Sequence, residues 1–137
     1  MKILCFLLDN KKLFFDTCLV DDDMPILFTC IDEDKNHYLT LCVDMNLPKY
    51  NVISITGKQL NDLLQGSLSM KEIFTLQSSY WEIKSIDQEM IHDIVTVKPM
   101  KEIDSKELPK DTMFTLFNLA LEEYAAKIKA KEMEYGD

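Results

Sequence analysis

The sequence of 137 residues contains no arginine, since all 15 residues of the Lys and Arg group are lysine. A protein that reads base edges or clamps phosphate with a bidentate guanidinium fork needs arginine, so this absence argues against both classes. The 24 acidic residues leave a net charge of −9. A polyanionic surface repels nucleic acid, and we therefore expect no direct nucleic-acid binding.

Glycine and proline are also scarce, at 3 and 4 residues, which leaves no linker or low-complexity tract. No apolar run approaches the roughly 20 residues of a membrane span, and residues 3–8 are too short for the core of a secretion signal. The 4 cysteines form no C-x-x-C pair and no zinc-ligand spacing, and they are interpreted as small core residues. We predict a cytoplasmic protein of bacterial or phage origin, without a membrane, metal or cofactor.

What is present is typical of one packed domain, with 47% hydrophobic and 28% charged residues. We expect a single domain over 1–137. Its parts are a strand-rich region with two short helices (1–97), an exposed, charge-rich connector (98–111) and a C-terminal helix (112–134).

The first part is dominated by short apolar runs separated by polar turns, which is typical of antiparallel strands. The Asp9-Asn10 pair between two such runs predicts a tight hairpin turn. The expected strands are 1–8, 11–20, 26–31, 38–43, 50–55, 80–86 and 91–97.

Two helix starts interrupt this pattern. Thr56 with Gln59, and again Ser69 with Glu72, have the spacing of capping boxes, in which each side chain bonds the other's backbone. Gly66 stands where a left-handed residue would end the first helix.

A longer helical pattern begins at Asp111, a good N-cap. Its apolar residues recur at helical spacing. They are Met113, Phe117, Ala120, Leu121, Tyr124 and Ile128. The expected fold class is therefore α+β: a mainly antiparallel sheet with two short central helices and a long C-terminal helix packed on it.

Residues 12–83 resemble a family of small bacterial proteins that contain a domain of unknown function. The resemblance is carried by caps, turns and core positions. These are 23–28, Tyr38-Leu39, Val43-Asp44, 63–66 and 69–74. It implies the same fold and transfers no catalytic residue.

Candidate chemistry is sparse. Asp32, Asp34 and Asn36 match the first ligands of a calcium loop, but His37 stands where the loop needs glycine and Val43 where it needs glutamate. An acidic hairpin turn is the favoured interpretation. No hydrolase, metalloprotease or phosphate-binding motif is present, so we assign no catalytic residue and expect a non-enzyme.

The acidic charge is concentrated in two turns. The candidate partner-binding residues are Asp21, Asp22, Asp23, Asp32, Glu33 and Asp34. If the two groups flank one strand, they lie roughly 25 Å apart at strand rise. Such patches would steer a basic partner, which predicts an acidic interaction, inhibitor or immunity-type module that engages a basic protein.

A second candidate interface is the start of the C-terminal helix, where Phe114, Leu116 and Leu119 widen the apolar surface for a partner or a second copy of the chain. The alternative function is a small enzyme or small-ligand-binding domain with a site between sheet and C-terminal helix. A deep pocket lined by His92, Asp93 and a cysteine would favour that alternative.

Overall fold

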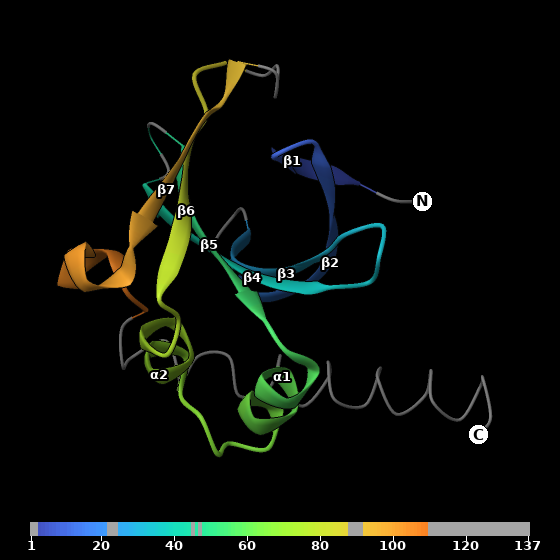
Figure 1. The fold of residues 1–137 in the computed structure, drawn as a ribbon, viewed down its shortest axis with the longest axis vertical. Helices are drawn as coiled ribbons and strands as arrows, with labels where there is room; N and C mark the ends of the chain where they lie inside the picture. Colours follow the sequence, from blue (N-terminus) through green and yellow to red (C-terminus); the bar gives the residue numbers. More distant parts are fainter. Residues whose placement is uncertain (1–2, 22–24, 45, 47, 88–91, 110–137) are drawn as a thin grey trace.

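A computed structural model describes residues 3–21, 25–44, 46, 48–87 and 92–109. Seven strands follow one another in a single antiparallel sheet, in the order of the sequence. They are β1 (Leu4–Leu8), β2 (Lys11–Asp21), β3 (Pro25–Ile31), β4 (His37–Asp44), β5 (Lys49–Ile55), β6 (Ser79–Lys84) and β7 (Ile94–Pro99). Figure 1 shows the sheet curled into a trough, with β1 and β2 forming one wall and β6 and β7 the other.

The hairpin at Asp9-Asn10 is confirmed. Leu8 pairs directly with Lys11, and both turn residues have positive φ, 48° and 70°. Positive φ at both central residues is the requirement of the two-residue turn whose twist matches the flanking strands.

The curl depends on irregular pairing in β2. Its register against β3 shifts between Phe15 and Thr17 and again on both sides of Val20. Each extra residue bends the strand and moves the following side chains to the other face. Leu13 and Leu19 accordingly join different core clusters although both have odd numbers.

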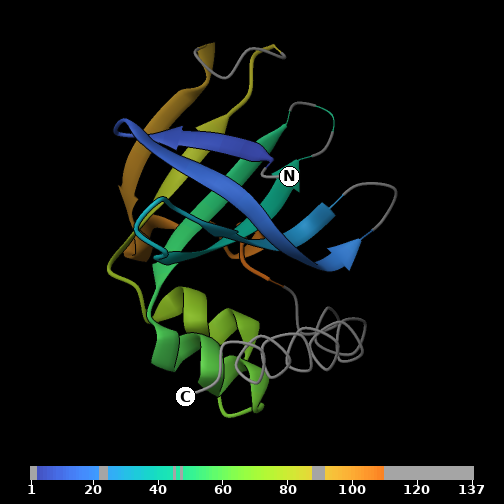
Figure 2. The same cartoon turned by 90° about the vertical axis from the view of Figure 1, so that its right-hand side faces the viewer.

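Two short helices, α1 (Gly57–Leu64) and α2 (Met70–Thr75), connect β5 to β6. Both predicted capping boxes are confirmed, because each N-cap side chain accepts from the N3 backbone and each N3 side chain reaches back. Gly66 follows the C-cap of α1 with φ of 81°. The helices lie together at one end of the molecule in both views (Figure 1 and Figure 2).

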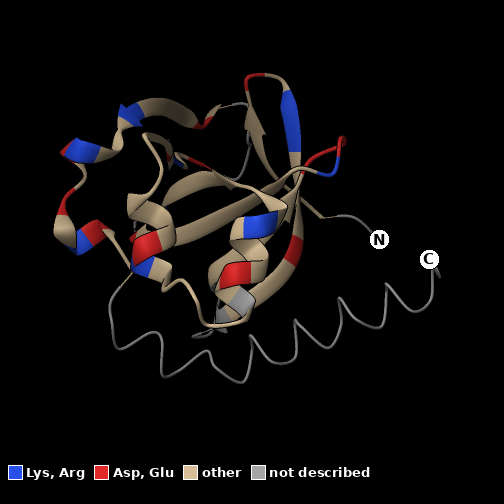
Figure 3. Ribbon diagram, turned by 60° about the horizontal axis from the view of Figure 1, so that its bottom comes forward, with Lys and Arg blue, Asp and Glu red and all other residues tan. Residues whose placement is uncertain are grey.

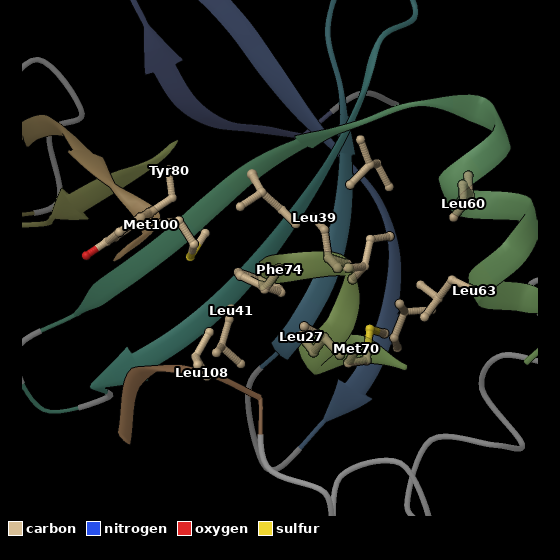
Figure 4. Close-up of a cluster of buried hydrophobic side chains, with 14 residues drawn as sticks. Leu27, Leu39, Leu41, Leu60, Leu63, Met70, Phe74, Tyr80, Met100 and Leu108 are labelled. Atoms are coloured by element: carbon tan, nitrogen blue, oxygen red, sulfur yellow. The ribbon is translucent and has the colours of Figure 1, made fainter. Parts of the chain in front are cut away.

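The outer face of the curled sheet and the two helices enclose one buried cluster, the helix-side cluster (Figure 4). Its members are Leu19, Leu27, Leu39, Leu41, Ile53, Ile55, Leu60, Leu63, Met70, Ile73, Phe74, Tyr80, Met100 and Leu108. Met100 belongs to the short 3-10 helix η2 (Met100–Glu102), and Leu108 follows a second one, η3 (Ser105–Glu107). The segment expected to be an exposed connector therefore contributes to the core.

The inner, concave face holds a second cluster, the trough-side cluster. Its buried members are Phe6, Leu8, Leu13, Phe28, Cys30, Tyr38, Val52 and Ile83. Along β3, β4 and β5, residues of the trough-side cluster alternate with residues of the helix-side cluster, because successive side chains of a strand point to opposite faces.

The expected α+β class is wrong. The described chain is mostly an antiparallel, seven-stranded half-barrel, with helices of only 8 and 6 residues. The class is mainly β because the curled sheet itself supplies most of both buried clusters, one on each of its faces. The predicted helix over 112–134 lies outside the described residues.

Candidate functional site

The trough contains a pocket of about 380 Å³ between β1 and the segments that connect β6 to β7. This volume lies in the range of small-molecule sites, which is about 300–1,000 Å³. The lining residues are Cys5, Phe6, Phe28, Tyr50, Ser85, Asp87 and Asp93. Strands β1, β3 and β5 supply the apolar part, and the segments flanking the β6–β7 connection supply the polar part.

Three aromatic rings form the apolar wall. Tyr50 meets Phe6 and Phe28 edge-on, with ring centroids 5.2 and 6.3 Å apart, and Phe6 stacks on Phe28 at 6.2 Å. Phe6 and Phe28 are buried, whereas Tyr50 is half-buried at the pocket. Edge-on and offset arrangements at these distances are the favourable contacts of aromatic rings.

Asp93 is the distinctive polar group of the pocket. Its Oδ1 is buried and has no hydrogen-bond partner among the described residues. Burial raises the pKa of the Asp93 carboxyl, the hydrogen bond from Ser85 partly opposes this, and the Asp87 charge adds to the increase. A buried acceptor without a partner is costly, so a ligand that donates a hydrogen bond there would remove that cost.

The other polar groups at this end form a pair. His92 Nδ1 lies 2.5 Å from Asp87 Oδ2, and both side chains are about half exposed. The strand expected over 91–97 begins at Ile94, so His92 and Asp93 precede β7. Asp93 and Cys5 thus line the same pocket. His92 does not line it but contacts Asp87, which does.

The acidic turn between β3 and β4 is arranged around Asp32, which is only 5% exposed. Its Oδ1 accepts the backbone N–H groups of Asp34 and Asn36, each at 2.9 Å. Its Oδ2 accepts the Asn36 side-chain amide at 3.0 Å and the Tyr38 hydroxyl at 2.9 Å. Burial alone would raise the pKa of Asp32, but these hydrogen bonds lower it overall.

Of the predicted partner-binding residues in this turn, Glu33 and Asp34 are exposed. The carboxylate of Asp32 is buried and accepts hydrogen bonds from within the turn and from Tyr38. Lys11 and Lys12 line the same surface hollow as the turn, so basic charge stands beside the acidic charge. Figure 3 shows acidic and basic positions interspersed over the described ribbon.

The remaining predicted residues are placed as follows. Asp21 ends β2, at the opposite end of β3 from the Asp32 turn. Asp22 and Asp23, and the proposed helix interface of Phe114, Leu116 and Leu119, lie outside the described residues.

A polar network that sequence reasoning missed lies on the outer face. Glu82 is 3% exposed, and its carboxylate bonds Lys98 at 2.8 Å and Lys49 at 3.3 Å. Lys49 also pairs with Glu107 of η3, whose carbonyl accepts from the Asn51 amide at 3.2 Å. Burial alone would raise the pKa of Glu82, but the lysines lower it overall. The network attaches η3 to β5 and β6.

Within the ranges that the structure describes, no group of three or more His, Cys, Asp or Glu side chains could hold a metal ion. None of the helices in those ranges is long and apolar enough to cross a membrane.

Sequence reasoning named His92, Asp93 and a cysteine but missed the pocket's aromatic wall. Phe6, Phe28 and Tyr50 are distant in sequence, and each looks like an ordinary strand residue. Cross-strand geometry alone brings them together, and no local pattern could have indicated it.

Comparisons of the chain with family models, with curated proteins and with solved structures found no match. The resemblance over residues 12–83 to a bacterial family of unknown function therefore stays a prediction.

Proposed function

We propose that this protein binds a small molecule in the pocket of the trough. The observation that carries the proposal is the buried Oδ1 of Asp93, which has no hydrogen-bond partner in the described part of the chain and lies beside the aromatic wall of Phe6, Phe28 and Tyr50. Small-molecule sites typically combine an apolar lining with a few convergent polar groups. The alternative site predicted between the sheet and the C-terminal helix stays a prediction, because that helix lies outside the described residues.

The chemistry of the lining selects the class of ligand. An aromatic wall favours an apolar or aromatic body, and two carboxylates at the mouth favour a positive charge. A primary or secondary ammonium group would donate to Asp93 and be attracted by Asp87. We therefore propose a small aromatic amine as the ligand class.

The test is a binding series by NMR shift perturbation with 2-phenylethylamine, 2-phenylethanol and phenylacetate. We expect binding to weaken in that order, because the charge changes from positive to neutral to negative while the ring is kept. Asp93→Asn should weaken amine binding by about tenfold or more, as loss of a charge-assisted hydrogen bond does. Glu33→Gln, which lies outside the pocket, is the matched control and should bind like the wild type.

Equal binding of all three probes, or full amine binding by Asp93→Asn, would overturn the proposal. The affinity should also fall as the pH falls through the raised pKa of Asp93, since the protonated carboxyl no longer attracts the amine.

A second candidate is the predicted acidic docking module, favoured by one observation. The hydrogen bonds of Asp32 hold a turn that leaves Glu33 and Asp34 exposed. If this turn docks a basic protein, Glu33→Gln with Asp34→Asn should weaken salt-sensitive capture of that protein. Lys11→Gln with Lys12→Gln should strengthen it, because neighbouring positive charge is removed. Unchanged capture by both double variants would exclude this docking site.

We also propose a reducing location such as the cytoplasm of a bacterium or a phage-infected cell. The support is that Cys5, Cys18, Cys30 and Cys42 are all free thiols.

A further inference from the structure

A second pocket, of about 330 Å³, lies beside the turn between β1 and β2. We call it the hairpin pocket. The hairpin contributes Asp9 and Lys11 to its lining, and strands β4, β5 and β6 contribute Tyr38, Ser54 and Trp81. Its volume is in the range of small-molecule sites.

The hairpin pocket is distinct from the pocket at Asp93, and the two share no lining residue. Along β5, Tyr50 lines one pocket and Ser54 the other. Trp81 of β6 and Ser85, just after that strand, are divided between the pockets in the same way. Residues four positions apart in a strand are on the same face and roughly 13 Å apart. The trough therefore has one pocket toward each end.

Two aromatic rings line the hairpin pocket. The rings of Tyr38 and Trp81 have their centroids 6.1 Å apart and are tilted by 58°. Tyr38 is buried, and Trp81 is half-buried. Such a lining favours a flat, largely apolar ligand.

Trp81 also supplies the distinctive polar group. Its Nε1 is buried and has no hydrogen-bond partner among the residues that the structure describes. The Tyr38 hydroxyl and the Asn36 side-chain amide, which also line the pocket, already donate to Asp32, at 2.9 and 3.0 Å. An indole N–H can only donate, and a buried donor without a partner is costly. A ligand that accepts a hydrogen bond from Trp81 would remove that cost.

The charges around the pocket favour a neutral acceptor. Asp9 and Lys11 are both exposed at its edge, and their charges oppose each other. The Asp32 carboxylate stands behind Tyr38, and its lowered pKa keeps it ionised at neutral pH. A carboxylate ligand would therefore meet two negative groups and one positive group, whereas a carbonyl oxygen would avoid that repulsion.

We propose that the hairpin pocket binds a small, neutral, flat molecule whose carbonyl oxygen accepts a hydrogen bond from the Trp81 indole N–H. This site has the opposite hydrogen-bonding requirement to the pocket at Asp93, where an acceptor needs a donor. The inference does not depend on the aromatic amine proposed above.

The test uses Trp81 itself as the reporter, because the chain contains one tryptophan. Its indole N–H therefore gives one resonance in the NMR spectrum of the isotope-labelled full chain. The probes are benzamide, benzoate and benzylamine. We expect benzamide to bind most tightly and to move the indole resonance downfield. Benzoate should bind more weakly because of the two carboxylates, and benzylamine should bind most weakly because its ammonium group accepts no hydrogen bond.

The variants separate the hydrogen bond from the charge. Trp81→Phe keeps an aromatic ring but removes the donor, and it should weaken benzamide binding at least about fivefold. The backbone amide of Ser54 reports binding in this variant, after circular dichroism has shown that the variant is folded.

Asp9→Asn should strengthen benzoate binding and narrow its difference from benzamide, because one of the repelling carboxylates is removed. Asp62→Asn, in α1 and outside the pocket, is the matched control. It should leave the affinity for each probe within about twofold of the wild type.

An indole resonance that benzamide does not move at millimolar concentration would overturn the proposal, and would show that water satisfies the N–H. Full benzamide binding by folded Trp81→Phe, or tighter binding of benzoate or benzylamine at Trp81, would overturn it as well. A failure of amine binding at Asp93 is a separate outcome, because it leaves the Trp81 resonance unaffected.

Discussion

The two faces of the curled sheet contrast in how completely they are covered. On the outer face, α1, α2, η2 and η3 cover the helix-side cluster, and leucine, isoleucine and methionine fill the space. On the inner face no helix of the described chain covers the aromatic side chains, and a pocket remains beside them. The covered face holds the larger buried cluster, and the open face holds the pocket of the proposed site.

The largest expected effect tests this division with two phenylalanines. Phe74→Ala should lower the free energy of unfolding by about 3–5 kcal/mol, because Phe74 is fully buried and leaves an enclosed cavity. Phe28→Ala should cost about 1–2 kcal/mol less, since its removal only enlarges a pocket that solvent already reaches. Urea denaturation of both variants measures the difference, and equal costs would break the contrast between the faces.

The next largest effect concerns Asp32, whose carboxylate bonds Tyr38 of the trough-side cluster. Asp32→Ala should lower the free energy of unfolding by about 2–3 kcal/mol, because it removes charge-assisted hydrogen bonds and leaves the buried Tyr38 hydroxyl without its acceptor. Glu33→Gln in the same turn is the control and should change stability by less than about 0.5 kcal/mol. Thermal unfolding can compare the two. A loss equally small in both variants would show that the turn does not anchor this face.

The outer face has its own polar anchor at Glu82. Glu82→Gln should lower the free energy of unfolding by about 1–2 kcal/mol at neutral pH, because Lys98 loses its carboxylate partner and Lys49 keeps only Glu107. The pKa of Glu82 is lowered in the folded state, so its contribution is present above the ordinary carboxyl pKa and is lost as pH falls through the lowered value. Denaturation at neutral pH and at about pH 3 should therefore show the variant and wild type converging in acid. A constant difference would contradict this assignment.

The smallest expected effect has the opposite sign. Asp93→Leu should raise the free energy of unfolding by up to about 1 kcal/mol, because an apolar side chain replaces a buried acceptor that has no partner within the described ranges. The same variant should lose amine binding. Paired measurements of stability and affinity would sharpen the division between the faces, whereas a loss of stability would show that Asp93 is a structural residue.

Local signals predicted the local structure well. The hairpin at Asp9-Asn10 and the two capping boxes need only residues within four positions of each other, and all three are present. The failures were at longer range. The charge-rich stretch after β7 looked solvent-exposed, yet Met100 and Leu108 are buried because η2 and η3 turn them toward the outer face.

The candidate site was less predictable than the fold. Asp32 looked like part of an exposed acidic patch, but its carboxylate is buried by donors from Asp34, Asn36 and Tyr38. Lys11 and Lys12 come from a different hairpin, so the sequence could not predict that they lie beside this turn. Electrostatic patches depend on which turns become neighbours, and turn sequences do not encode that.

Period, turn chemistry and capping were readable in the order of the amino acids, because the interactions that stabilise them join residues close in the chain. The bulges of β2, the curl of the sheet and the meeting of Cys5, Tyr50 and Asp93 came only with the folded molecule. Their physical cause is the packing of distant strands across a concave surface. Side chains separated by dozens of residues line one pocket on that surface, and burial acts on the pKa of Cys5, Tyr50 and Asp93 alike.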